Sequence, residues 1–126
     1  MKKYNFRSMQ ASIKDAFIDS KKGALNFIIF TSYNCDILVK YNGVVIPLYN
    51  HDYSTTTSKQ ATIYSGIATN ERRARYNYLM QHCDAFRELE KHARFKTCFN
   101  LISVNADIIH DAILQAYEAI KANSNI

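Results

Sequence analysis

The chain has 126 residues, a length at which one hydrophobic core is expected, and we predict a single domain over residues 1–126. Apolar residues make up 48% of the chain, with nine Tyr and seven Phe, and this globular composition excludes a disordered protein. The formal net charge of +5 attracts nucleic acid, acidic proteins or anionic lipid at long range, but it does not choose among them.

Hydropathy and cysteine usage predict where the protein resides. The longest unbroken apolar run is Phe27 to Phe30, far below the roughly 20 residues that span a bilayer, so we expect no membrane anchor. The stretch from Ser8 to Ser20 carries Lys14 and Asp15, which leaves no apolar core for a secretory signal. An odd number of widely spaced cysteines predicts free thiols in a reducing compartment, the cytoplasm. These cysteines are Cys35, Cys83 and Cys98.

The first two elements are predicted from hydrophobic periodicity. Met9, Ile13, Ala16 and Phe17 fall on one face of a helix, so we predict a helix over Ser8 to Lys22 that Gly23 ends as a C-cap. Residues Leu25 to Tyr33 contain a continuous run of β-forming apolar residues. We expect a strand there, covered on both faces and central in its sheet.

An Asn-Gly pair indicates a β-hairpin over Ile37 to Leu48. Asn42 and Gly43 suit the two positive-φ positions of a type I′ turn. This register places three facing pairs on one side of the pleat, which we interpret as the core face. The pairs are Tyr41 with Val44, Val39 with Ile46, and Ile37 with Leu48. Pro47 cannot donate to a ladder, so the second arm is expected at a sheet edge.

The second half of the chain reads as helical. Thr57 and Gln60 fit a capping box that opens a short helix through Tyr64, closed by Gly66. A long helix is predicted from Glu71 to about Phe95, with Thr69-Asn70 as its cap. Its apolar stripe consists of Leu79, Cys83, Phe86, Leu89 and Ala93.

The C-terminal part contains one ambiguous segment and one clear helix. Residues Lys96 to Val104 fit a connector, a helix end or a short strand equally well. Asn105 or Ser103 then caps a helix from Ala106 to about Ala122 with a clear apolar face. The predicted fold is therefore α+β: an N-terminal helix, a small antiparallel sheet with an Asn-Gly hairpin, a long helix and a C-terminal helix.

The sequence offers no recognisable catalytic or metal site. The cysteines form no C-x-x-C pair and the four histidines form no i,i+4 pair, so we predict no metal, with Cys83 in the core and His82 on the surface. The three glycines belong to no phosphate-binding or nucleophile-elbow motif, and we predict no cofactor and no enzymatic activity. A small hydrolase that uses His51 or His110 has no supporting constellation.

Cationic residues of the predicted long helix are the strongest binding signal. Interleaved Arg and Tyr side chains could lie on phosphates and stack on bases. The predicted binding residues are Arg72, Arg73, Arg75, Tyr76, Arg87, Lys91 and Arg94. The competing interpretation is a solvated helix laced with ion pairs, because acidic residues alternate with these bases. The Ser/Thr run from Ser54 to Ser58 could likewise hold phosphate, although helix capping explains it better.

Three segments of the chain follow one pattern: Phe30 to Tyr33, Ile37 to Val39 with the hairpin, and Tyr53 to Gln60. This pattern resembles a motif of small uncharacterised phage and mobile-element proteins. Those proteins carry a Ser-Tyr, a hairpin and a Thr-Thr-Ser-Lys-His segment. The matching residues here are Ser32-Tyr33, the hairpin, and Thr56-Thr57-Ser58-Lys59, with Gln60 in place of the usual histidine. The match covers about a quarter of the chain and implies a mobile-element origin rather than a biochemical activity.

Our leading hypothesis is a phage accessory protein in the cytoplasm of a host cell. It would bind and inhibit a host defence protein or nucleoprotein, such as a CRISPR effector, through the cationic helix. The alternative is a nucleic-acid-binding module that uses the same helix, with an affinity that falls steeply with salt. Dimerisation through Ile108 and Leu114 of the C-terminal helix is left open.

Overall fold

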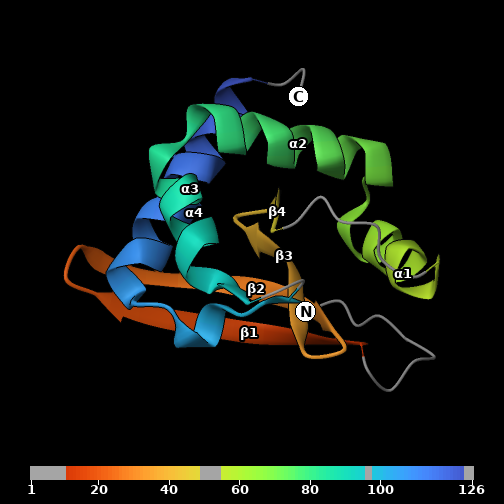
Figure 1. Cartoon of the computed structure of the whole chain (residues 1–126), viewed down its shortest axis with the longest axis horizontal. Coiled ribbons are helices and arrows are strands. Elements are labelled where there is room, and N and C mark those ends of the chain that lie inside the picture. The colour runs from red at the N-terminus through yellow and green to blue at the C-terminus, as the bar shows by residue number, and fades with distance from the viewer. Residues whose placement is uncertain (1–10, 49–54, 96–97, 124–126) are drawn as a thin grey trace.

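Four antiparallel strands form one sheet in the order β1-β2-β3-β4 (Figure 1). The computed structural model describes residues 11–48, 55–95 and 98–123. The strands of the sheet are β1 (Ala11–Ser20), β2 (Gly23–Ser32), β3 (Cys35–Tyr41) and β4 (Val44–Pro47). A second, two-stranded sheet pairs β5 (Arg94–Phe95) with β6 (Cys98–Phe99).

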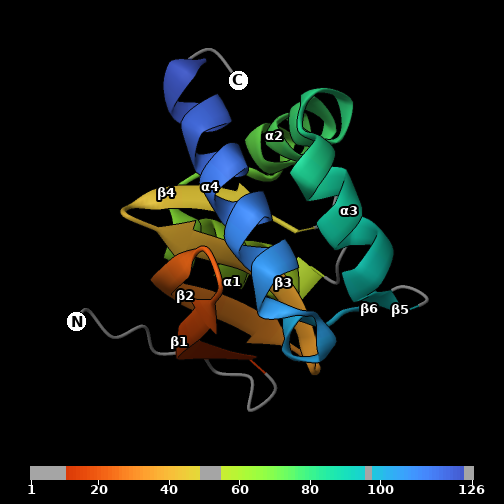
Figure 2. The same cartoon turned by 90° about the vertical axis from the view of Figure 1, so that its left-hand side faces the viewer.

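The helices follow the sheet in the chain and lie on both of its faces. They are α1 (Thr55–Ser65), α2 (Thr69–His82), α3 (Asp84–Ala93), the short 3-10 helix η1 (Leu101–Ser103) and α4 (Ala106–Ala122). Figure 2 shows α4 lying across the sheet with α3 beside it, whereas α1 lies apart from them on the opposite side. The α+β class is as predicted, but the order of elements is wrong at its start, because strands precede every helix of the described residues.

The sheet separates two hydrophobic clusters. Phe27, Val39 and Ile46 point from the strands toward α2, α3 and α4 and belong to the larger cluster. Phe30, Leu38 and Val45 point to the other face of the sheet, because side chains alternate along a strand. They form the smaller cluster with Ala61 and Tyr64 of α1. The Phe30 and Tyr64 rings stack with centroids 5.7 Å apart. β3 and the last residues of β2 are therefore covered on both faces.

The predicted N-terminal helix is wrong, because residues 11–20 form the strand β1. All ten residues pair with β2, from Ala11 opposite Ser32 to Ser20 opposite Gly23. Ala16 and Ile18 pack on the larger cluster, whereas Phe17, which the helical periodicity would bury, is 62% exposed. Pairing with a long neighbouring strand outweighed a local period that fitted either structure. Gly23, predicted as a helix C-cap, instead begins β2 with φ +139°.

The strand predicted over Leu25 to Tyr33 is confirmed as β2, which lies between β1 and β3. In β3 and β4, Tyr41 lies opposite Val44 and Val39 opposite Ile46. The intervening Asn42 and Gly43 have φ angles of 50° and 80°. β4 is an edge strand and ends at Pro47, as the missing proline N–H requires. The side of the pleat that carries Leu38 and Val45 is also buried, which the single predicted core face did not include.

The predicted long helix is two helices that meet at Cys83. This residue has extended backbone angles, φ −121° and ψ 104°, while its N–H still donates to Leu79 O at 2.9 Å. The break lets α3 turn so that Phe86 meets Tyr76 edge to face, with ring centroids 5.7 Å apart. The predicted apolar stripe from Leu79 to Ala93 is nevertheless buried throughout. Periodicity identified the buried residues but not the change of direction.

The other two helices agree with their predicted positions. α1 begins two residues before Thr57, so the predicted capping role of Thr57 is wrong. Gly66 follows the helix with φ +78°, and its N–H donates to Thr62 O at 2.8 Å. α4 has the predicted bounds, and Asn105 caps it by accepting from Asp107 N at 2.8 Å. Of the ambiguous stretch from Lys96 to Val104, residues 96–97 lie outside the described ranges, and the rest forms β6 and η1.

The prediction of three free thiols is wrong. Cys35 at the start of β3 and Cys98 in β6 form a disulfide, and Cys83 is the free cysteine. The pair is separated by 63 residues, so spacing in the sequence could not reveal it. Because disulfides persist mainly in oxidising compartments, the cysteines no longer support a reducing one. Among the described residues, no helix combines the length and apolar character needed to cross a membrane.

Candidate protein-binding face

α1 covers only part of its side of the sheet. Beyond it, one surface of β1 and β2 stays accessible, and we call it the open face. Phe17 lies opposite Asn26, and Asp15 lies opposite Ile28, which in turn faces Lys40 of β3. Phe17, Asn26 and Asp15 are exposed, and Ile28 is half-buried. An exposed aromatic ring among polar side chains is the usual composition of a protein-binding surface.

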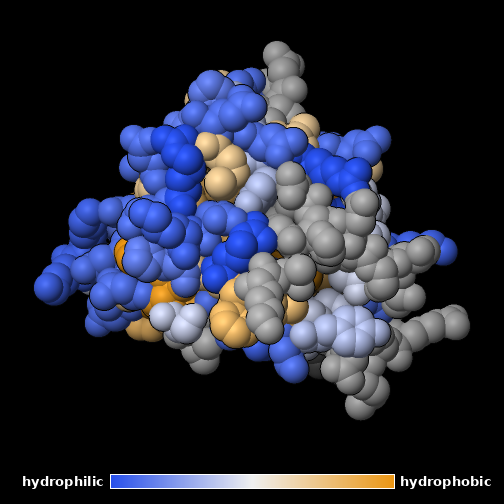
Figure 3. Space-filling view, in the orientation of Figure 1, coloured by the Kyte–Doolittle hydropathy of each residue, from blue (hydrophilic) through white to orange (hydrophobic). Residues whose placement is uncertain are grey.

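A hollow of about 490 Å³ lies on the open face, and its lining includes Asn26, the β2 partner of Phe17. Asp15, Asn26, Ile28 and Lys40 line it, and the turn at Asn42 and Gly43 closes one end. Lys40 is fixed at the boundary with α1, where its Nζ lies 4.7 Å from the Tyr64 ring and donates to Tyr64 O at 3.3 Å. In Figure 3 the most hydrophobic colours gather in the lower half of the view, where Figure 1 shows β1 and β2.

A second hollow, of about 540 Å³, lies on the other face of β1. We call it the upper hollow. Its apolar lining includes Ala16 and Ile18 of β1 and Val104 before α4. Asp15 and Phe17 also line it, and Lys14 and Asp36 add further charged groups. β1 therefore contributes residues to both hollows.

Asp36 is the buried titratable group of the upper hollow. It is 8% exposed, and one carboxylate oxygen accepts from Leu101 N at 2.7 Å. Burial raises the pKa of Asp36 above its ordinary value of 3.8, and the hydrogen bond from Leu101 and the charge of Lys14 partly oppose this rise. The bond joins β3 to the segment that follows β6, so Asp36 fixes one wall of the hollow.

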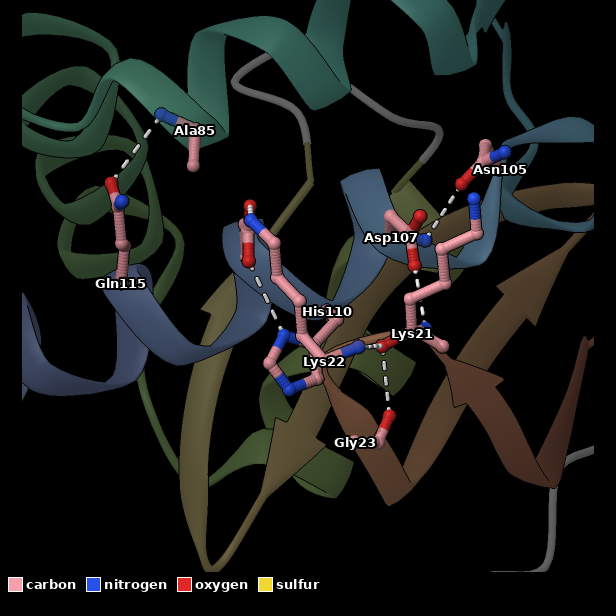
Figure 4. A network of polar contacts seen from close by, with 10 residues as sticks. Lys21, Lys22, Gly23, Ala85, Asn105, Asp107, His110 and Gln115 are labelled. Carbon is pink, nitrogen blue, oxygen red and sulfur yellow. Dashed lines mark hydrogen bonds and ion pairs between the residues drawn. The ribbon is translucent and has the colours of Figure 1, made fainter.

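The turn at the end of β1 is fastened to α4. Lys21 N donates to Asp107 Oδ1 at 2.8 Å, and Lys22 Nζ pairs with Asp111 at 2.6 Å (Figure 4). The hydrogen bond with Lys22 lowers the pKa of Asp111, and the same bond raises the pKa of Lys22. His110, buried on α4, places Nδ1 3.3 Å from Asp111. These contacts hold the β1–β2 hairpin in one orientation.

Two of the predicted cationic binding residues hold the fold together. Arg72 is 4% exposed and donates to Ile67 O at 2.8 Å, to Ser58 O at 3.4 Å and to the hydroxyls of Thr62 and Thr69. It thereby joins α1 to α2. Arg75 donates to Val45 O at 2.9 Å and to Glu71 at 3.1 Å. The guanidinium groups of Arg72 and Arg75 therefore bind acceptors within the protein itself.

The other predicted binding residues are spread over α2 and α3. Tyr76 is buried, and it accepts from Arg94 Nη2 at 3.1 Å. Burial raises the pKa of the Tyr76 hydroxyl, and the Glu90 carboxylate adds to the rise. Arg94 also pairs with Glu90, and Arg87 pairs with Asp84. Lys91 is exposed with Glu88 at 3.9 Å, and Arg73 is half-buried. The alternation with acidic residues thus appears as ion pairs along the helices.

The remaining predicted features are scattered. Cys83 is buried and His82 exposed, as predicted. Ser32 and Thr57, from two segments of the phage-protein resemblance, meet with their hydroxyl oxygens 3.0 Å apart in a buried contact. Ser54 and His51 lie outside the described residues. Within residues 11–48, 55–95 and 98–123, no three His, Cys, Asp or Glu side chains gather as metal ligands would.

Sequence reasoning missed the open face because it placed Phe17 in a helix. The available signal was the alternation from Lys14 to Ser20, in which Ala16 and Ile18 fall on one side and Asp15, Phe17 and Asp19 on the other. An aromatic residue between two aspartates is unusual for a core-facing position. No family model matches the chain, and neither a curated protein nor a solved structure matches it.

Proposed function

We propose that the chain is a non-enzymatic binding protein that docks onto a protein partner through the open face. A host defence protein or nucleoprotein is the partner class that the phage-protein resemblance favours. The observation that carries the proposal is the exposed Phe17, whose β2 partner Asn26 lines a hollow on a surface that α1 leaves uncovered. Aromatic side chains next to a recess are typical anchors of protein interfaces.

The rigid setting of the open face supports this proposal. The hairpin is fastened at its turn by Lys21 and Lys22, and at the other end Ser12 Oγ lies 2.7 Å from Thr31 Oγ1. A surface that is already ordered loses little conformational freedom when a partner binds. Phe17 therefore offers contact area at a low entropic cost.

Direct binding of nucleic acid is less well supported. Arg72 and Tyr76 are buried, and Arg75 is committed to Val45 and Glu71. Phosphate contacts need cationic groups that can replace counterions at the surface. Arg87 and Lys91 are exposed, but each lies beside an acidic partner.

Site-specific photocrosslinking tests the proposal. A photoreactive residue replaces Asn26 on the open face or, as a matched control, the exposed Glu118 on α4, and each variant is expressed in cells that carry defence systems. We expect a discrete protein adduct from position 26 alone. A Phe17→Asp change should remove this adduct without changing the folded state by circular dichroism. Equal adducts from both positions would contradict the proposal.

The nucleic-acid alternative needs its own measurement. Binding to labelled duplex DNA, single-stranded DNA and RNA is compared at low and physiological salt for the wild type and an Arg87→Ala, Lys91→Ala double variant. These two residues are chosen because changes at Arg72 or Arg75 would disturb the fold. We expect no binding that depends on them. Binding that collapses with salt and in the variant would favour the alternative.

A further inference from the structure

We propose that β1 accepts an extended segment of the partner as an additional strand, with side chains that alternate between apolar and basic residues. The inference rests on the proposed function and specifies how the partner is held. Within the described residues, β1 pairs with β2 on one side only, along all ten of its residues. The backbone groups of its outer edge are a template for another strand.

The opposite edge of the sheet shows how this chain closes a strand edge. β4 has four residues and ends in Pro47, which has no N–H to donate. Arg75 Nη1 donates to the Val45 carbonyl at 2.9 Å, and α2 packs along the strand. β1 contacts α4 on one face, but among its described residues it has no proline and no side chain is recorded as donating to its outer carbonyls, and it is more than twice as long. An open edge of this length is a liability unless it has an occupant.

The upper hollow lies where side chains of an added strand would point. Residues of a strand alternate between its faces, so every second side chain of the incoming segment enters the upper hollow. That recess is lined on the β1 side by Ala16 and Ile18 and beyond by Val104, Leu101 and Ile109. Its lining also includes polar residues, but the apolar side chains named here favour an apolar occupant. The polar residues are Lys14, Asp15, Asn34, Asp36 and Asn100.

The other side chains of the segment lie over the open face. Asp15, Phe17 and Asp19 are on this side of β1, and all three are exposed. Two carboxylates that flank an aromatic ring favour Lys or Arg, which can pair with the charges and stack on the ring. The same two carboxylates disfavour acidic segments. The pattern therefore selects alternating apolar and basic residues.

A synthetic peptide tests this chemistry on the full chain. The probe is the end-capped heptapeptide Lys-Ile-Lys-Val-Lys-Ile-Lys, which reads the same in both directions and so allows either strand orientation. We expect the outward-facing β1 amides to exchange hydrogen about tenfold more slowly at ten times the peptide Kd. Phe17→Ala should weaken binding about fivefold, because it removes the ring between the two carboxylates.

Two N-methylated peptides separate strand addition from docking by side chains. Adjacent residues of a strand direct their N–H groups to opposite edges. The two peptides should therefore differ in affinity. One, methylated at the apolar or at the Lys positions, should not bind, and the other should bind as the unmethylated peptide does. Equal affinities for both peptides would overturn the proposal.

Charge reversal tests the selectivity. The double variant Asp15→Lys, Asp19→Lys should lose about tenfold in affinity for the Lys peptide and gain affinity for the matching Glu peptide. An unchanged preference, or no wild-type binding at about 1 mM peptide, would overturn the proposed partner chemistry. A concentration-dependent dimer that protects β1 without peptide would make a second copy of the chain the occupant, and this would also overturn the proposal.

The test distinguishes failure of this inference from failure of the proposed function. If the probe at position 26 yields a protein adduct but the β1 amides of that complex exchange as in the free chain, the partner binds without strand addition. The proposed function would then stand and the inference would fall.

Discussion

β1 and β4 are the two edge strands of one sheet, and their outer edges meet different surroundings. β4 is short, ends in Pro47 and is covered by α2, and Arg75 donates to one of its carbonyls. β1 is ten residues long, and the described part of the chain leaves its outer edge without a strand partner. This difference between the edges is the reason for proposing that β1 receives a strand, because an unprotected edge promotes pairing.

The largest expected difference lies between core and surface positions of the two edge strands. Ile46 of β4 is 1% exposed, so Ile46→Ala should lower the free energy of unfolding by about 2–5 kcal/mol. Phe17→Ala on β1 serves as the matched control and should cost less than about 1 kcal/mol. Urea denaturation measures both. Equal losses would show that Phe17 is buried and that the open face does not exist.

Loss of the disulfide should have the next largest effect. Cys35 and Cys98 join the start of β3 to β6, whose following residues form a wall of the upper hollow. Cys98→Ser should lower the free energy of unfolding by about 2–4 kcal/mol, because the unfolded chain loses a cross-link. Oxidised wild type treated with reductant should match the variant. A midpoint of denaturation that does not respond to reductant would contradict the assignment of this pair.

Removing the protection of β4 should have a smaller effect. Arg75→Gln removes the donor to Val45 O and should cost about 1–3 kcal/mol, because a partly buried carbonyl loses its partner. Lys91→Gln is the control, since this side chain is 75% exposed, and it should change stability by less than about 0.5 kcal/mol. Sedimentation should also show more self-association of the Arg75 variant. Equal stability and equal self-association of the two variants would show that Arg75 does not protect the β4 edge.

The smallest expected effect is a pH dependence at Asp36. Because burial raises its pKa above 3.8, the folded state retains the proton where the unfolded chain has lost it. The contribution of Asp36 to stability is therefore complete below the ordinary value and is lost as pH rises through the raised pKa. Relative to Asp36→Asn, the wild type should become less stable over this interval. Denaturation of both proteins at several pH values would reveal the slope, and the opposite sign would contradict it.

Local patterns were sufficient where one physical preference dominated. The short, continuous apolar run of β2 indicated a strand, although its first half is covered on one face only, and the Asn105 cap and apolar face of α4 indicated a helix. The stripe from Leu79 to Ala93 was found because burial follows helical spacing on both sides of the break. The break itself was missed, because nothing in the sequence at Cys83 interrupts the helical period.

The candidate site was harder to predict than the fold. The spacing of Ile13, Ala16 and Phe17 fits a helix, and only the ten-residue pairing with β2 makes it a strand. Arg72 was predicted to face a partner, but its position between α1 and α2 surrounds it with carbonyl and hydroxyl acceptors. A charged residue in the sequence does not reveal whether its partner lies inside or outside the protein.

The sequence by itself determined the α+β class, the buried strand β2, the positive-φ residues Asn42 and Gly43, and the last helix with its cap. These features depend on periodicity and backbone preferences within a few neighbouring residues. Only the tertiary structure decided that Cys35 meets Cys98, that Arg75 reaches Val45, and that β1 is an edge strand of the described sheet. Each of these depends on contacts between segments far apart in the chain, which local patterns do not specify.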